Sequence, residues 1–174
     1  MAKRLGYLVD PAYIPGLVEA YKEALVQRGI EPTPPQIFIA IQTDRIFRMP
    51  ALRLLEAQQK HTQVYSYLFD WHSPAAKGVM KSCHAVELAY VFGTHKKQGA
   101  AKFYGEGPAA DALAKQTMDA WVAFARNGKP GWDAYDKESR STHIFGENCR
   151  SENAPFEIER EAWSEVPDAF LGSL

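Results

Sequence analysis

Apolar residues recur at helical spacing in several stretches of the chain, and these stretches predict most of its secondary structure. Between residues 14 and 28 they repeat every three or four positions, and Gly29 suits the residue that follows a helix. The same criteria predict further helices over residues 35–47, 50–60, 109–127 and 157–163. Because proline lacks a backbone N–H and clashes with the preceding turn, Pro50 is expected to separate two of these helices.

Two segments have the composition of β-strands. Val64–Phe69 is aromatic and largely apolar on both alternating faces, which is typical of a strand covered on both sides, and Ser141–Phe145 is a shorter candidate. The order of helices and strands predicts the α/β class, with few strands and mostly helices. Because two strands alone form only a marginal sheet, we expect residues 1–174 to be a single segment of a larger α/β sheet.

The overall composition predicts a globular chain without nucleic-acid or membrane partners. The 20 basic and 21 acidic residues form no basic stripe, and no apolar run approaches the length of a membrane span. The N-terminus carries Lys3 and Arg4 but no apolar stretch after them, so no secretory leader is expected. Cys83 and Cys149 form no CxxC pair, which favours a reduced, cytoplasmic protein over one long-range disulfide.

The motif search excludes several chemistries and leaves one histidine. The sequence contains no Gly-x-Ser-x-Gly, HExxH, Walker or GxGxxG motif. Its histidines lack metal-ligand spacing, so no metal and no cofactor is expected, and three of them are expected at the surface: His72, His95 and His143.

His84 has a different setting. It follows the predicted strand Val64–Phe69 after a loop and opens an apolar segment, with Glu87 three positions later. Functional groups of open α/β sheets gather beyond the carboxyl ends of the strands, and histidine exchanges protons near neutral pH. His84 is therefore the candidate catalytic residue. The alternative is a structural histidine that bonds a backbone carbonyl.

Four segments resemble the type B carboxylesterase family, which includes bacterial para-nitrobenzyl esterases and cholinesterases, in their order and spacing. Two are distinctive: His-Ala-Val-Glu-Leu, which begins at His84, and Phe-Ala-Arg-Asn-Gly-Lys-Pro, which ends at Pro130. The other two are Thr43–Pro50 and Val64–Trp71. The resemblance extends from about Tyr13 to about Trp163.

The resemblance implies the C-terminal portion of an α/β-hydrolase fold and a Ser-Glu-His triad in which His84 is the histidine. It would take the serine proton during attack on an ester and return it to the leaving alkoxide. In this fold the serine comes first, then the acid, then the histidine. Only 83 residues precede His84, so the resemblance implies that the serine, the oxyanion-hole glycines and the acid lie before residue 1.

Other polar and aromatic residues receive structural interpretations. Glu87 is expected to be a structural hydrogen-bonding residue, because the family's acid comes from another strand end. A Cys83–His84 dyad is disfavoured, since adjacent side chains rarely face each other. Asp44 and Arg45 are expected to form a helix polar pair. The aromatic residues expected in the core, with an interface role as the alternative, are Trp121 and Phe124.

Two hypotheses remain open at this stage. In the first, the chain is an esterase segment that supplies His84, is inactive alone, and acts on a small ester only in the complete enzyme. In the second, it is a non-catalytic, esterase-derived module that self-associates or binds a partner. Both predict exposed apolar surface, covered either by the missing N-terminal esterase portion or by a second copy of the chain in a dimer or higher oligomer.

Overall fold

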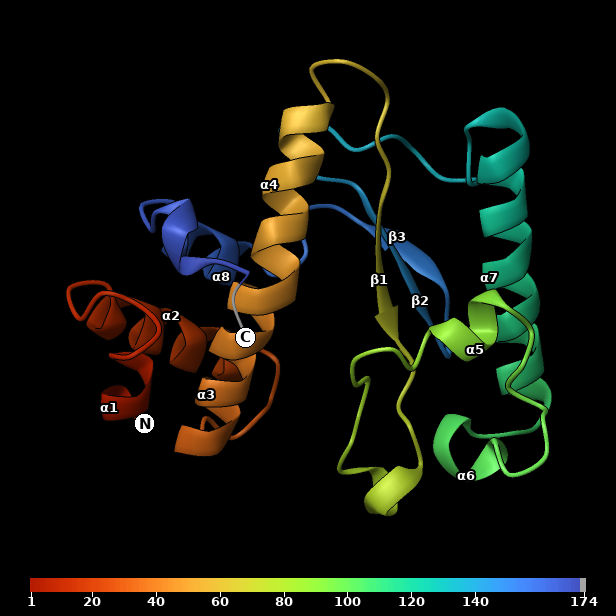
Figure 1. Cartoon of the computed structure of the whole chain (residues 1–174), viewed down its shortest axis with the longest axis horizontal. Coiled ribbons are helices and arrows are strands. Elements are labelled where there is room, and N and C mark those ends of the chain that lie inside the picture. Colours follow the sequence, from red (N-terminus) through yellow and green to blue (C-terminus); the bar gives the residue numbers. More distant parts are fainter. Residues whose placement is uncertain (173–174) are drawn as a thin grey trace. The chain divides into compact units, whose positions relative to one another are not determined.

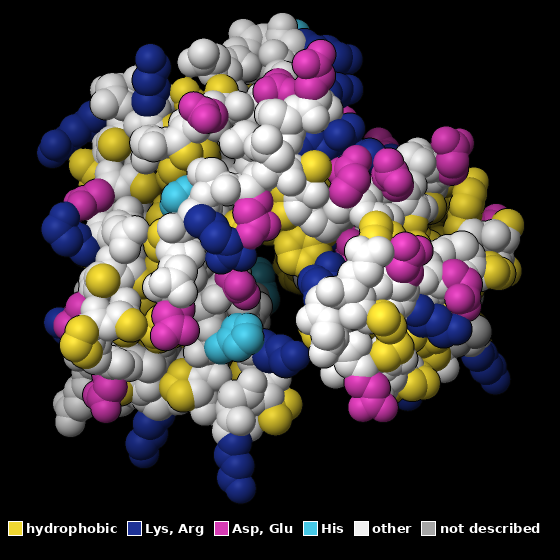
Figure 2. All heavy atoms as spheres, turned by 180° about the vertical axis from the view of Figure 1, so that it is seen from behind, with side chains coloured by type: hydrophobic (Ala, Val, Ile, Leu, Met, Phe, Trp, Pro, Cys, Tyr) yellow, Lys and Arg dark blue, Asp and Glu magenta, His cyan; other side chains and the backbone are white. Residues whose placement is uncertain are grey.

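The structure, a computed structural model, describes residues 1–172 and divides into two compact units. One, the helical unit, comprises residues 1–62 together with the chain from Pro155 onward. The other, the sheet unit, comprises Gln63–Ala154. Figure 2 shows basic and acidic side chains interspersed on the visible face of each unit.

The helical unit is built around α2. Its elements are α1 (Ala2–Leu5), α2 (Ile14–Gln27), α3 (Pro34–Thr43), the π-helical turn η1 (Asp44–Arg48), α4 (Met49–Gln58), α8 (Glu157–Ala162) and the 3₁₀ turn η3 (Asp168–Phe170). Helix α2 packs against both α3 and α8. It buries Leu17 and Tyr21 in a core that also contains Ile37 and Ile41 of α3 and the distant Trp163. The predicted helix over 14–28 is therefore confirmed, and its apolar face forms the centre of this unit.

The two helices expected on either side of Pro50 are present as α3 and α4, but the expected break between them is a π-helical turn rather than an end of the helical course. Figure 1 shows α3 and α4 as one continuous rod, in which Pro50 occupies the first turn of α4. The π-helical turn η1 joins them, and the Met49 N–H donates to the carbonyl of Asp44, five residues earlier. A π turn contains one extra residue and interrupts the regular i to i−4 pairing, just where Pro50 cannot supply an N–H.

The sheet unit contains three strands in the order β1-β2-β3. Strands β1 (Ser66–Asp70) and β2 (Thr142–Gly146) are parallel, and β2 is antiparallel to β3 (Arg150–Glu152). The first two strands confirm the predicted ones. The third was missed because Arg-Ser-Glu has neither apolar alternation nor β-propensity. Among residues 1–172 no strand pairs with the outer edge of β1, so this edge is open.

A long crossover connects β1 to β2, as parallel pairing requires. It contains the 3₁₀ turn η2 (Ala75–Gly78), α5 (Leu88–Val91), α6 (Ala101–Tyr104) and α7 (Pro108–Asn127). Helices α5 and α7 pack against each other beside the sheet (Figure 1). Aromatic rings fill the layer between helices and strands: Phe69 lies 5.3 Å from Tyr90, and Tyr67 lies 5.5 Å from Phe145. Within residues 1–172 no helix combines the length and apolar character that a membrane crossing requires.

Candidate functional site

His84 lies on an exposed turn directly before α5. The turn is closed by the Val86 N–H, which donates to the Cys83 carbonyl at 3.2 Å. Ala85 adopts a left-handed backbone with φ of 67°, a conformation that L residues adopt rarely. His84 is therefore carried on a tight turn as a solvent-exposed residue.

Two hydrogen bonds hold the chain before this turn at the end of β1. The hydroxyl of Ser82 donates to the carbonyl of Phe69 at 2.5 Å, and the Ser73 N–H donates to the carbonyl of Lys81 at 3.0 Å. Phe69 is the penultimate residue of β1. The loop that leaves β1 thus returns to the carboxyl end of the same strand and places His84 there. This is the edge of an α/β sheet where functional groups gather.

The chain after His84 is fixed by burial. Val86 is 1% exposed and Tyr90 is fully buried, so the turn leads directly into the core of the sheet unit. The hydroxyl of Tyr90 and the indole N–H of Trp71 both donate to the carbonyl of Tyr104 at the end of α6. These bonds tie the segment after α5 to the segment after β1.

His95 was expected at the surface, and that expectation is wrong. Its ring is 5% exposed and stacks on Tyr90 with 5.4 Å between ring centroids. Its Nε2 lies 3.0 Å from Asp111 in the first turn of α7. Hydrogen bonds from Lys96 and from His95 lower the pKa of Asp111. The Lys-rich sequence around His95 gave no sign of this burial. The contact between His95 and Asp111 attaches the segment after α5 to α7.

The other two histidines expected at the surface differ from each other. His72 is exposed, with 62% of its side chain accessible, as predicted. His143 is only half-buried, because its ring stacks on Trp132 at 4.6 Å between centroids. Burial lowers the pKa of His143.

Glu87 lies near strand β1. Burial raises the pKa of Tyr67, and the negative charge of Glu87 raises it further. The carboxylate of Glu87 therefore acts on a side chain of the sheet. Its structural role stays a prediction.

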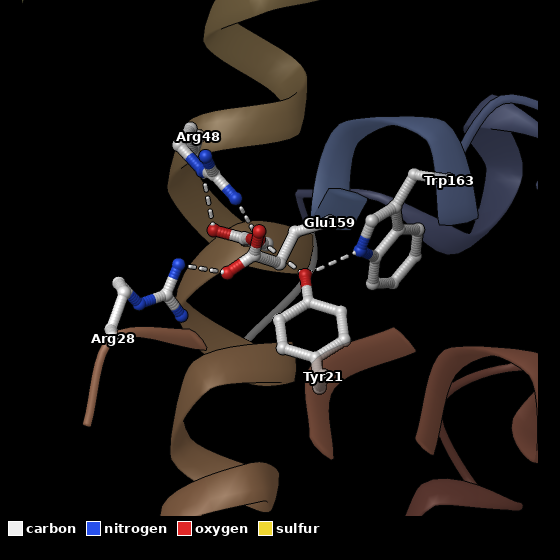
Figure 3. A network of polar contacts seen from close by, with 6 residues as sticks. Tyr21, Arg28, Arg48, Glu159 and Trp163 are labelled. Atoms are coloured by element: carbon white, nitrogen blue, oxygen red, sulfur yellow. Dashed lines mark hydrogen bonds and ion pairs between the residues drawn. The ribbon is translucent and has the colours of Figure 1, made fainter. Parts of the chain in front are cut away.

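The helical unit contains a buried polar network, in which Figure 3 shows Tyr21, Arg48 and Trp163. Asp44 accepts hydrogen bonds from the hydroxyl of Tyr21 and from the guanidinium of Arg48. The indole N–H of Trp163 donates to the same hydroxyl at 2.7 Å. Sequence reasoning paired Asp44 with its neighbour Arg45. The structure instead pairs it with Arg48 one helical turn later, because residues four apart share a helix face.

A second ion pair completes this network. Arg28 contacts the buried carboxylate of Glu159 at 2.5 Å. The guanidinium groups of Arg28 and Arg48 lie 4.8 Å and 4.5 Å from the ring centre of Phe156. These contacts join α2, η1 and α8 through paired charges, which is a structural role rather than a catalytic one.

The described part of the chain, residues 1–172, offers no cluster of three or more metal-ligating side chains. Both Cys83 and Cys149 are free thiols.

The expected core positions of Trp121 and Phe124 are wrong, since these side chains are 45% and 50% exposed. They lie over β1, where Trp121 contacts Tyr67 and Phe124 contacts Tyr65.

A parallel strand with an exposed histidine turn at its carboxyl end, backed by a long crossover helix, is an arrangement of the α/β-hydrolase fold. The sequence profile described as the carboxylesterase family matches residues 16–163, so the chain belongs to this family. Its α/β-hydrolase fold is shared with a carboxylesterase from Geobacillus stearothermophilus, with a TM-score of 0.72 and 34% identity. That likeness covers 86% of this chain and 32% of the Geobacillus chain.

Curated relatives agree with this assignment. The para-nitrobenzyl esterase of Bacillus subtilis (strain 168) is 33% identical over 131 residues, which are 71% of this chain and 26% of that enzyme. A human protein named cocaine esterase is 29% identical over 129 residues, covering 68% of this chain and 22% of the human protein. The chain therefore spans about a quarter of the length of the curated relatives it matches.

Proposed function

We propose that the chain forms the C-terminal part of a carboxylic ester hydrolase and that His84 is the histidine of its Ser-Glu-His triad. The observation that carries this proposal is the place of His84 on an exposed turn tied to the carboxyl end of β1. His84 also lies inside the region that matches the carboxylesterase family.

The chemistry follows from the imidazole. One ring nitrogen accepts the proton of a serine hydroxyl as the serine oxygen attacks the ester carbonyl, and the same nitrogen returns the proton to the leaving alkoxide. A carboxylate on the other ring nitrogen orients the ring and stabilises its protonated form. The serine and the glutamate would come from sequence outside these 174 residues, and a small ester is the substrate of the complete enzyme.

The open edge of β1 supports a partner that completes the sheet. Four of the five residues of β1 are half-buried although no strand covers its outer edge within residues 1–172. Trp121 and Phe124 on α7 extend apolar surface over this strand. An uncovered edge with apolar neighbours is prone to pairing with another strand. The serine-bearing portion of the esterase is the partner that also completes the triad.

A second candidate function uses the same surface. A non-catalytic module would pair β1 with a second copy of the chain, and His84 would then have no role in proton transfer. The exposed Trp121 and Phe124 are the observation that favours this candidate.

A complementation assay tests the proposal. The purified chain alone should not hydrolyse a short p-nitrophenyl ester, but it should do so when combined with the serine-bearing portion of the Bacillus subtilis relative. His84→Gln should remove this hydrolysis, whereas His72→Gln, which changes an exposed histidine in the loop before it, should retain it. Hydrolysis that survives His84→Gln would contradict the proposal.

A further inference from the structure

Two different anchors hold the turn that carries His84. After the turn, Val86 is buried in the core of the sheet unit. Before it, the side chain of Ser82 makes the hydrogen bond to the carbonyl of Phe69 at 2.5 Å. The histidine lies between the two, on a residue that is itself exposed. Its position relative to β1 therefore depends on both anchors.

The backbone around His84 needs such an anchor. Lys81 and Ala85 both have left-handed backbones, with φ of 46° and 67°. Left-handed geometry is unfavourable for residues with a Cβ atom and persists only where surrounding contacts impose it. Within this turn His84 is exposed, whereas Ser82 and Ala85 are half-buried. A hydrogen bond from Ser82 supplies a directional contact at this point.

We propose that Ser82 is a positioning residue for His84. Its hydroxyl, by donating to the Phe69 carbonyl, fixes the histidine turn at the carboxyl end of β1. The catalytic consequence rests on the proposed function of His84, but the ordering of the turn does not.

Ser73 provides a matched control in the same loop. Its hydroxyl also donates to a backbone carbonyl at 2.5 Å, but that carbonyl belongs to Phe103 in α6. The bond holds the segment after α5 rather than the histidine turn. Ser73→Ala thus removes the same kind of bond, of the same length, from a different attachment, together with the bond that the hydroxyl accepts from the Ala75 N–H at 3.2 Å. It keeps the Ser73 backbone N–H that donates to the Lys81 carbonyl.

Backbone ¹⁵N relaxation of the 174-residue chain tests the ordering. In the wild type the order parameter of the His84 amide should be near ~0.85, and Ser82→Ala should lower it below ~0.6. Ser73→Ala should leave it unchanged. An unchanged His84 order parameter in Ser82→Ala, or an equal fall in Ser73→Ala, would overturn the proposal.

Ser82→Thr and Ser82→Val extend the comparison with two side chains of equal shape. Threonine keeps the donor and should preserve the order of the His84 amide, whereas valine lacks the donor and should not. If removal of the hydroxyl instead unfolded the whole sheet unit, Ser82 would be a general requirement of the fold, and a specific positioning role would be refuted.

Kinetics of the complemented enzyme give the second readout. Misplacement of a proton-transfer group affects the chemical step more than substrate binding, so Ser82→Ala should lower kcat about 10- to 100-fold and change KM less than about twofold. Ser73→Ala should leave both constants unchanged. An equal fall in kcat in both variants, or an increase in KM without a fall in kcat, would refute the positioning role. If His84→Gln were fully active, the triad assignment would fail, while the order parameters would still decide the role of Ser82.

Discussion

At the scale of single residues, the polar groups that hold the fold differ in setting from the one proposed for chemistry. Tyr21, Asp44 and Arg48 satisfy one another inside the helical unit. His84 lies on an exposed turn at the end of a strand. Sequence reasoning could single out His84, because its neighbours in the chain carry the family resemblance. It could not predict the burial of His95, which depends on Tyr90 and Asp111 from separate elements.

The hydroxyl of Tyr21 is expected to contribute measurably to stability. Burial raises its pKa, and the charge of Asp44 raises it further, so the group stays a neutral donor. Tyr21→Phe leaves the Trp163 N–H without its acceptor and Asp44 with one donor fewer. The free energy of unfolding should fall by about 2 kcal/mol in urea denaturation. Tyr7→Phe, at a residue 77% exposed, should change it by less than about 0.5 kcal/mol. Equal effects of the two substitutions would argue against the network.

His143 is expected to make stability depend on pH. Burial lowers its folded-state pKa, so the unfolded chain binds the proton more readily. Stability should therefore fall as the pH drops through the unfolded value of about 6.5. His143→Phe keeps an aromatic ring against Trp132 and removes this contribution. The difference in melting temperature between pH 7.5 and pH 5.5 should thus be smaller in the variant. The same difference in both proteins would contradict this account.

At the scale of elements, periodicity predicted the long helices and both parallel strands within a few residues. It failed where pairing between elements decides the structure. Strand β3 exists because β2 offers it an edge, and its own sequence carries no strand pattern. Pro50 does not end the helical course, because the π turn before it already departs from i to i−4 pairing where the proline lacks an N–H. Neither feature can be recognised from local propensity.

Two glycines should respond in opposite directions to the same substitution. Gly128 ends α7 in a left-handed conformation, with φ of 73°, whereas Gly16 lies inside α2 with helical geometry. A Cβ atom would meet nothing within 4 Å at either position. Gly128→Ala should therefore destabilise the protein by about 1 kcal/mol, and Gly16→Ala should stabilise it by about 0.5 kcal/mol. Thermal unfolding of both variants measures the signs, and equal signs would refute the cap assignment.

At the scale of the whole molecule, the described residues form three strands, and none of them pairs with the outer edge of β1. Sequence reasoning anticipated this shortage of strands, since Val64–Phe69 is apolar on both faces. The family assignment accounts for the small number of strands, because this chain matches only 32% of the longer Geobacillus carboxylesterase. Trp121 and Phe124 were predicted in the core and are exposed, because helical periodicity identifies an apolar face but not which element covers that face.

Self-association of the isolated chain should depend on the surface over β1. Sedimentation at micromolar concentration should show a dimer or larger species, since the open edge and apolar side chains are exposed together. The double substitution Trp121→Ser with Phe124→Ser should weaken association about tenfold. Val26→Ser, at a residue 60% exposed in the helical unit, should have no effect. A chain that remains monomeric at these concentrations would contradict the prediction.

The central claim is that His84 exchanges a proton with the nucleophilic serine of an esterase. The most direct measurement is the distance from the nearer ring nitrogen of His84 to that serine oxygen, in a crystal structure of the chain with its serine-bearing portion. The account predicts about 3 Å, which is hydrogen-bond reach. A distance well beyond that reach with no bridging water, or another histidine in this place, would contradict it.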